Sequence, residues 1–123
     1  MRKVALANSR LETKVGELWL ADTFLNRLRG LLGRPVLNAG EGLWLKPCRQ
    51  VHMFGMHYPL SIWFLDQDRR VLRIIDGLNP GEVSPLCREA ASVIEFPAEW
   101  GARTKTLVGD RLVEIIGVSR SCG

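Results

Sequence analysis

The stretch CRQVHMFGMHYP, residues 48–59, gathers one cysteine, two histidines and two methionines within twelve positions. Thiolate, imidazole and thioether groups are preferred ligands of copper and zinc, so Cys48, His52 and Met56 are candidate metal ligands. Their spacing of four residues would place them on one face of a helix. The aromatic, glycine and proline residues among them are poor helix formers, however, and the flanking sequence favours a strand.

On a strand, the same spacing separates the three candidate ligands too widely. Four strand residues span about 13 Å at roughly 3.3 Å each, whereas a zinc ion holds its ligands at about 2.0–2.3 Å. Cys48, His52 and Met56 could share an ion only if the chain bends at Gly55 or another strand supplies a ligand. We interpret residues 48–59 as a strand in which methionine fills gaps in the core, and we expect no cofactor.

The same stretch offers a catalytic alternative. Cys48 beside His52 or His57 could form a thiolate–imidazole pair, which would activate the cysteine as a nucleophile. The spacing does not require this pair, and the sequence has no nucleophile elbow, P-loop or glycine-rich dinucleotide turn. A metal- or thiol-dependent enzyme centred on residues 48–57 therefore remains the alternative to a protein that only binds.

Two carboxylates, Glu95 and Asp110, stand at the ends of predicted strands. They could act together as general acid and base. They could instead be structural, by pairing with Arg27 or by accepting hydrogen bonds from turn N–H groups, and this interpretation is favoured. If Arg27 and Glu95 meet while partly buried, loss of either partner would cost several kcal/mol.

The chain has more tryptophan than a core of its size needs. The four tryptophans are Trp19, Trp44, Trp63 and Trp100. Trp63 lies between Ile62 and Phe64 and therefore takes the opposite face of a strand, so it faces outward if those two are buried. We predict an aromatic surface patch of Trp63, His57 and Tyr58 that binds a partner.

Composition is that of one globular domain. Of 123 residues, 46% are hydrophobic and 24% are charged, and no repeat or linker divides them. Residues 1–123 are therefore expected to form a single domain with a mobile tail at 119–123. No apolar run approaches the roughly 20 residues that cross a bilayer, and the first ten residues lack the core of an export signal. We expect a soluble, cytoplasmic protein with no membrane partner.

The net charge of +4 is concentrated in the first half of the chain. Residues 1–61 hold nine Lys/Arg against four Asp/Glu, and residues 62–123 hold eight against nine. A basic half favours anionic partners, but the basic residues are scattered and no recognition motif accompanies them, so nucleic acid is disfavoured. The three cysteines, Cys48, Cys87 and Cys122, are too few and too widely spaced for a disulfide framework.

The hydrophobic pattern predicts about seven short strands and one helix. The helix covers residues 23–32, with a cap at Asp22 or Thr23 and a stop at Gly33. The strands are expected at 4–7, 15–21, 42–47, 61–65, 71–75, 91–96 and 111–118. Residues 61–65 and 71–75 should pair as a hairpin, residues 76–85 should form a loop, and one or two helical turns should follow Pro97. This pattern predicts a mainly β fold, a compact antiparallel sandwich or distorted barrel with the helix packed across it.

Four segments occur in one order along nearly the whole chain: TFLNRLRGLL (23–32), HMFGMHYPLSIWFLD (52–66), VIEFPA (93–98) and VGD (108–110). Together they resemble the small prokaryotic family known as domain of unknown function 192 (DUF192). That family usually has an acidic residue where this chain has Ser61. The resemblance implies a compact β-rich fold and no particular activity.

These observations predict a binding or accessory module rather than an enzyme. Its partner is expected to be another protein or a small polar ligand. The candidate binding residues are Trp63, His57, Tyr58, Arg27, Glu95 and Asp110.

Overall fold

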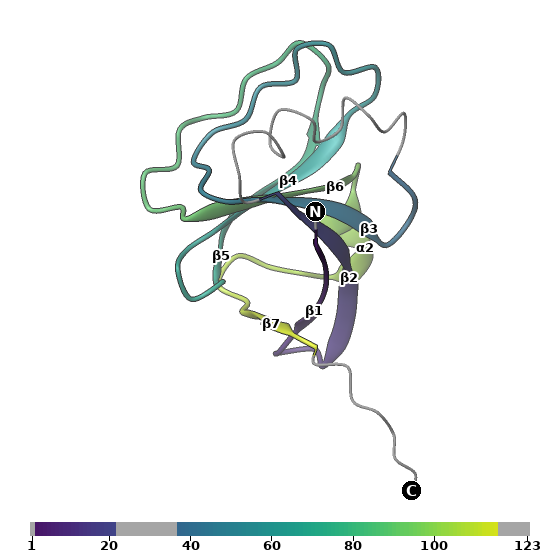
Figure 1. The fold of residues 1–123 in the computed structure, drawn as a ribbon, viewed down its shortest axis with the longest axis vertical. Coiled ribbons are helices and arrows are strands. Elements are labelled where there is room, and N and C mark those ends of the chain that lie inside the picture. Colours follow the sequence, from purple (N-terminus) through teal and green to yellow (C-terminus); the bar gives the residue numbers. More distant parts are fainter. Residues whose placement is uncertain (1, 22–36, 116–123) are drawn as a thin grey trace, which may run out of the picture.

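The fold is a single curled sheet of seven strands, seen in a computed structural model that describes residues 2–21 and 37–115 (Figure 1). The elements are β1 (Arg2–Asn8), β2 (Thr13–Ala21), β3 (Glu41–Leu45), β4 (Leu60–Leu65), β5 (Val71–Leu78), β6 (Ser92–Pro97), the short helix α2 (Trp100–Thr104) and β7 (Leu112–Glu114). The strand order across the sheet is β5-β4-β6-β3-β2-β1-β7. The mainly β prediction is confirmed, as are the hairpin of β4 with β5 and the helical turn after Pro97.

The sheet is antiparallel except between β2 and β3, which run parallel. The predicted antiparallel character is confirmed for the sheet as a whole, and this one parallel pair is an addition to it. Parallel neighbours need a crossover connection of about a dozen residues or more, and residues 22–40 supply it. The helix predicted at 23–32 falls in this connection and lies outside the described residues, as does the tail at 119–123.

The two edges of the sheet meet at one end, which gives the molecule its half-barrel shape. The amide of Val71, at the start of β5, donates to the carbonyl of Asp110 at 2.8 Å, and the amide of Gly109 donates back to the carbonyl of Val71 at 2.7 Å. The amide of Leu112 in β7 donates to the carbonyl of Arg69 at 3.0 Å. These bonds satisfy edge groups that would otherwise be open to pairing with another chain.

Both faces of the sheet are covered by apolar side chains. The barrel cluster, inside the curl, comprises Val4, Leu6, Val15, Leu18, Leu20, Trp44, Trp63, Leu65, Val71, Ile94, Phe96 and Leu112. The loop-side cluster, on the opposite face, comprises Ala21, Leu37, Leu43, Leu45, Cys48, Val51, Met53, Leu60, Ile62, Phe64, Leu78, Ala90 and Val93. Consecutive residues of a strand alternate between the two faces, so the central strands carry mostly apolar side chains on both faces.

Residues 48–59 are a loop and not the expected strand. They make one isolated bridge, between His52 and Val83, and the backbone turns at Gly55, where φ is 80°. The loop pairs with a second loop at 79–91, since the amide of Met53 donates to the carbonyl of Glu82 at 2.8 Å. The two loops rise together above β4 and β6 (Figure 1). A regular strand does not form here for two reasons. Pro47 and Pro59, at the two ends of the stretch, have no N–H group to donate to a neighbouring strand, and Gly55 takes a left-handed conformation.

Trp63 is buried, so its predicted place in an exposed aromatic patch is wrong. It does lie opposite Ile62 and Phe64, as alternation requires, but all three side chains are 0% exposed. Because the sheet curls around one face and two loops cover the other, neither side of β4 reaches solvent. The Trp63 indole N–H donates to the Ser61 hydroxyl at 2.9 Å inside the barrel.

Candidate functional site

The residues predicted to bind do not form one site. Tyr58 and Glu95 lie within electrostatic range of each other on the loop-side face, whereas Asp110 belongs to a separate cluster near the end of β1. His57 is exposed beside Tyr58 and makes no hydrogen bond or ring contact with the residues that the structure describes. Arg27 lies outside the described residues, so its predicted pairing with Glu95 stays a prediction.

Glu95 is a buried carboxyl group in the middle of the sheet. Its strand, β6, sets it opposite Leu43 of β3 and Ile62 of β4, both members of the loop-side cluster. The residue is only 7% exposed, and its carboxyl group makes no hydrogen bond or ion pair with any residue that the structure describes. Desolvation therefore raises the pKa of Glu95 to about 7, because burial disfavours the charged form.

Tyr58 brings a second polar group without a partner to the same face. The residue packs against the loop-side cluster, and its hydroxyl is buried without a hydrogen-bond partner among the described residues. Desolvation raises the pKa of Tyr58 and the negative charge of Glu95 raises it further, while the nearby Leu37 backbone, without forming a well-aligned hydrogen bond, lowers it in part. Tyr58 and Glu95 therefore lie close enough to interact electrostatically. Buried polar groups normally have hydrogen-bond partners, so the presence of two without a described partner on one face calls for an explanation.

The surroundings of Glu95 are apolar along a row that crosses the sheet. Trp19 is opposite Leu43, Leu43 is opposite Glu95, and Glu95 is opposite Ile62. Each set of opposite residues projects from the same face. At the far end of this row the Trp19 indole N–H donates to Glu41 at 3.1 Å. Glu95 is thus an ionisable group between apolar neighbours.

Asp110 is the opposite case, a carboxylate surrounded by donors. It accepts hydrogen bonds from Arg10 Nε at 2.6 Å, from Asn8 Nδ2 at 2.8 Å and from the Leu107 amide at 2.9 Å. The hydrogen bond from Arg10 is the main cause that holds the pKa of Asp110 well below its usual range. Its charged partner among the described residues is Arg10, and these bonds tie β1 to the turn that precedes β7.

Asp76 lies in β5 and not in the loop predicted at 76–85, so the sequence pattern does not reveal its role. One carboxylate oxygen of Asp76 accepts from the Ser61 hydroxyl at 2.7 Å and from the Gly101 amide at 2.8 Å, and the other accepts from the Ala102 amide at 2.9 Å. A carboxylate is therefore present beside position 61, although Ser61 itself carries none. The Asp76 carboxylate anchors α2 to the sheet. The predicted pairing of β4 with β5 was the feature of the sequence that could have indicated that Asp76 lies near Ser61.

The candidate metal and thiol residues occupy different environments. Cys48 is buried and its thiol donates to the Gln50 carbonyl at 3.3 Å, whereas His52 is exposed and stacked on Phe54 with ring centroids 4.7 Å apart. Met56 packs against the loop-side cluster. Within residues 2–21 and 37–115, no three His, Cys, Asp or Glu side chains are grouped so that they could hold a metal ion. The geometry therefore gives the metal and thiol alternatives no support.

Together, the half-barrel sheet, its paired covering loops and the buried Glu95 define a small β domain whose loop-side face holds the candidate site. Within the described part of the chain, no helix has the length and apolar character to cross a bilayer. The sequence profile of DUF192, an uncharacterized ACR, matches residues 5–114, and the chain belongs to this family. The predicted resemblance is confirmed.

Two solved structures share the fold. A protein of unknown function from Novosphingobium aromaticivorans DSM 12444 is 24% identical, with a TM-score of 0.74 over 90% of this chain and 83% of that one. A "putative transcription regulator" from Sinorhizobium meliloti 1021 is 22% identical, with a TM-score of 0.77 over 91% of this chain and 92% of that one. No curated protein matches the chain. At these identities the likeness establishes the fold alone.

Proposed function

We propose that this protein is a binding module that holds a small ligand by an ammonium group at Glu95 and Tyr58. The observation that carries the proposal is the pair of buried oxygen-bearing groups, on an apolar face, that have no hydrogen-bond partner in the described part of the chain. Buried polar groups without a partner cost free energy, and a ligand that hydrogen-bonds to them recovers it.

The chemistry of the pair favours a cation. A Glu95 carboxylate can accept charge-assisted hydrogen bonds from an ammonium group, and the Tyr58 oxygen can accept another. The aromatic face of Tyr58 also attracts cations. The apolar side chains of Leu43 and Ile62 flank Glu95 and suit a ligand with a short aliphatic body.

Binding is favoured over catalysis by what lies near the carboxyl group. A hydrolytic or acid–base enzyme needs a nucleophile or a second acid–base residue within hydrogen-bonding reach. Tyr58 is the titratable group whose pKa the charge of Glu95 raises, and this raised pKa keeps Tyr58 protonated. This arrangement suits recognition of a donor group.

The test is a titration of the protein with butylammonium chloride, followed by backbone amide chemical shifts in NMR spectra. We expect saturable shifts around Leu43, Tyr58 and Glu95. The affinity should rise between about pH 6 and about pH 8, because the ligand stays charged while Glu95 loses its proton with a pKa of about 7.

The controls separate this site from general attraction to carboxylates. Glu95→Gln should abolish the saturable shifts, whereas Glu89→Gln, which changes an exposed glutamate, should leave them intact. Equal binding to the wild type and the Glu95→Gln variant would contradict the proposal. Absence of saturable shifts in the folded wild-type protein at pH 8 would contradict it as well.

A further inference from the structure

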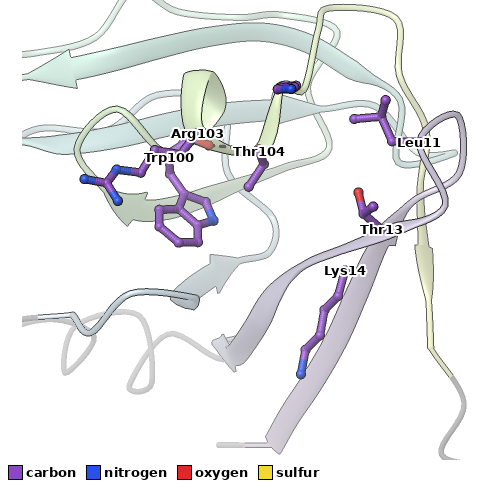
Figure 2. A pocket seen from close by; sticks show the side chains of 7 residues that line it. Leu11, Thr13, Lys14, Trp100, Arg103 and Thr104 are labelled. Atoms are coloured by element: carbon purple, nitrogen blue, oxygen red, sulfur yellow. Dashed lines mark hydrogen bonds between the residues drawn. The ribbon is translucent and has the colours of Figure 1, made fainter.

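A groove opens between the β1–β2 hairpin and α2, away from Glu95. Its volume is about 590 Å³, within the range of about 300–1,000 Å³ that small-molecule sites occupy. The hairpin contributes Thr13 and Lys14, and the helical segment contributes Trp100, Arg103 and Lys105. Figure 2 shows the Trp100 indole projecting from α2 toward the strand that carries Thr13 and Lys14.

The wall that carries Trp100 is held firmly. The indole N–H of Trp100 donates to the carbonyl of Val15 at 2.8 Å, which fixes the ring against β2. The ring also packs on Phe96, with centroids 6.2 Å apart. Asp76 anchors the first turn of α2 through the Gly101 amide, as described above. The aromatic surface is thus preorganised, which lowers the entropic cost of binding a flat ligand.

The groove is positively charged. Lys14, Arg103 and Lys105 line it, and no Asp or Glu is among its lining residues. Lys14 shares its charge with Glu17, since its Nζ lies 2.6 Å from a Glu17 carboxylate oxygen. The side chains of Arg103 and Lys105 make no ion pair within the described ranges, so their charges are available to an anion.

We infer that this groove is a second binding site, which takes a small anion with a flat apolar body. The anionic group, a phosphate, sulfate or carboxylate, is attracted by the positive charges of Lys14, Arg103 and Lys105 that line the groove, and the flat body lies against the Trp100 ring. The site is independent of Glu95, which prefers a cation. Because the groove is open, its charge attraction weakens as salt is added.

The experiment uses 1-naphthyl phosphate as the probe and isothermal titration calorimetry as the measurement. We expect saturable binding that is at least tenfold tighter than that of inorganic phosphate or of 1-naphthol, because each of these lacks one half of the recognised chemistry. In NMR spectra the indole N–H of Trp100 should shift, while those of the buried Trp44 and Trp63 should not.

A matched pair of double variants isolates the groove. Arg103→Gln with Lys105→Gln should weaken binding at least tenfold, whereas Arg73→Gln with Arg88→Gln removes the same charge from exposed positions that do not line the groove and should change binding less than twofold. Equal loss in both pairs would overturn the site by showing unspecific attraction. Tighter binding of an octaglutamate peptide than of 1-naphthyl phosphate would overturn the small ligand as its occupant.

Discussion

Glu95 and Asp110 are both carboxylates on this half-barrel, and their surroundings are opposite. Asp110 accepts hydrogen bonds from Asn8, Arg10 and the Leu107 amide, which lower its pKa. Glu95 has none of these within the described residues, and burial raises its pKa to about 7. The fold thus stabilises the charge at Asp110 and leaves the charge at Glu95 unfavourable, which identifies the first as structural and the second as the candidate for function.

The largest expected effect is at Asp110. The change Asp110→Ala leaves Asn8, Arg10 and the Leu107 amide without their acceptor, so the free energy of unfolding should fall by about 3 kcal/mol. Urea denaturation at pH 7 measures it. Asp68→Ala, at an exposed carboxylate, serves as the control and should change stability by less than about 0.5 kcal/mol. Equal effects of the two changes would remove the structural role assigned to Asp110.

The second prediction concerns the pH dependence of folding stability, which Glu95 and Asp110 should change in opposite directions. Glu95 keeps its proton in the folded protein up to a pKa of about 7, above its ordinary value of 4.5, so the folded state binds more protons between these values. Stability should fall as pH rises through this window, by at most about 1.4 kcal/mol per pH unit. Asp110, whose pKa is lowered, stabilises the fold above its ordinary value of 3.8 and loses that contribution as pH falls.

Stability measured against pH in two variants separates these contributions. Relative to the wild type, Glu95→Gln should flatten the decline between about pH 5 and about pH 7. Asp110→Asn should remove part of the loss of stability in acid. If Glu95→Gln left the decline unchanged, Glu95 would have an ordinary pKa and the contrast with Asp110 would fail.

The smallest effect is expected at Tyr58. The change Tyr58→Phe removes a buried hydroxyl without a described partner, so stability should stay constant or rise by up to about 1 kcal/mol. The same change should weaken butylammonium binding, because the ligand loses one acceptor. A loss of more than about 1 kcal/mol in thermal or urea denaturation would mean that the hydroxyl is satisfied in the folded protein.

The strands were predictable because alternation is a local signal. The parallel pairing of β2 with β3 and the burial of Trp63 were not, since both depend on how the whole sheet curls and what covers its outer face. The apolar content of residues 48–59 indicates a strand. The backbone of this segment instead forms its hydrogen bonds with a second loop, residues 79–91. Local sequence contains no information about that partner.

The candidate site was only partly predictable for the same reason. Tyr58 and Glu95 were both singled out, but their proximity depends on a loop that folds back over the sheet. Arg10 reaches Asp110 across a sequence separation of 100 residues, and at such separations the sequence does not indicate which arginine is the partner. The groove at Trp100 lies between the β1–β2 hairpin and α2, and no spacing in the sequence indicates that these two segments are neighbours.

The most direct test of the binding site is the pKa of the Glu95 carboxyl group, measured by its side-chain carbon shifts in an NMR titration with and without saturating butylammonium. We expect a pKa of about 7 in the free protein and a fall of at least one unit with the ligand, because a bound cation favours the charged form. A pKa near the ordinary 4.5 in the free protein, or a value that the ligand leaves unchanged, would contradict it.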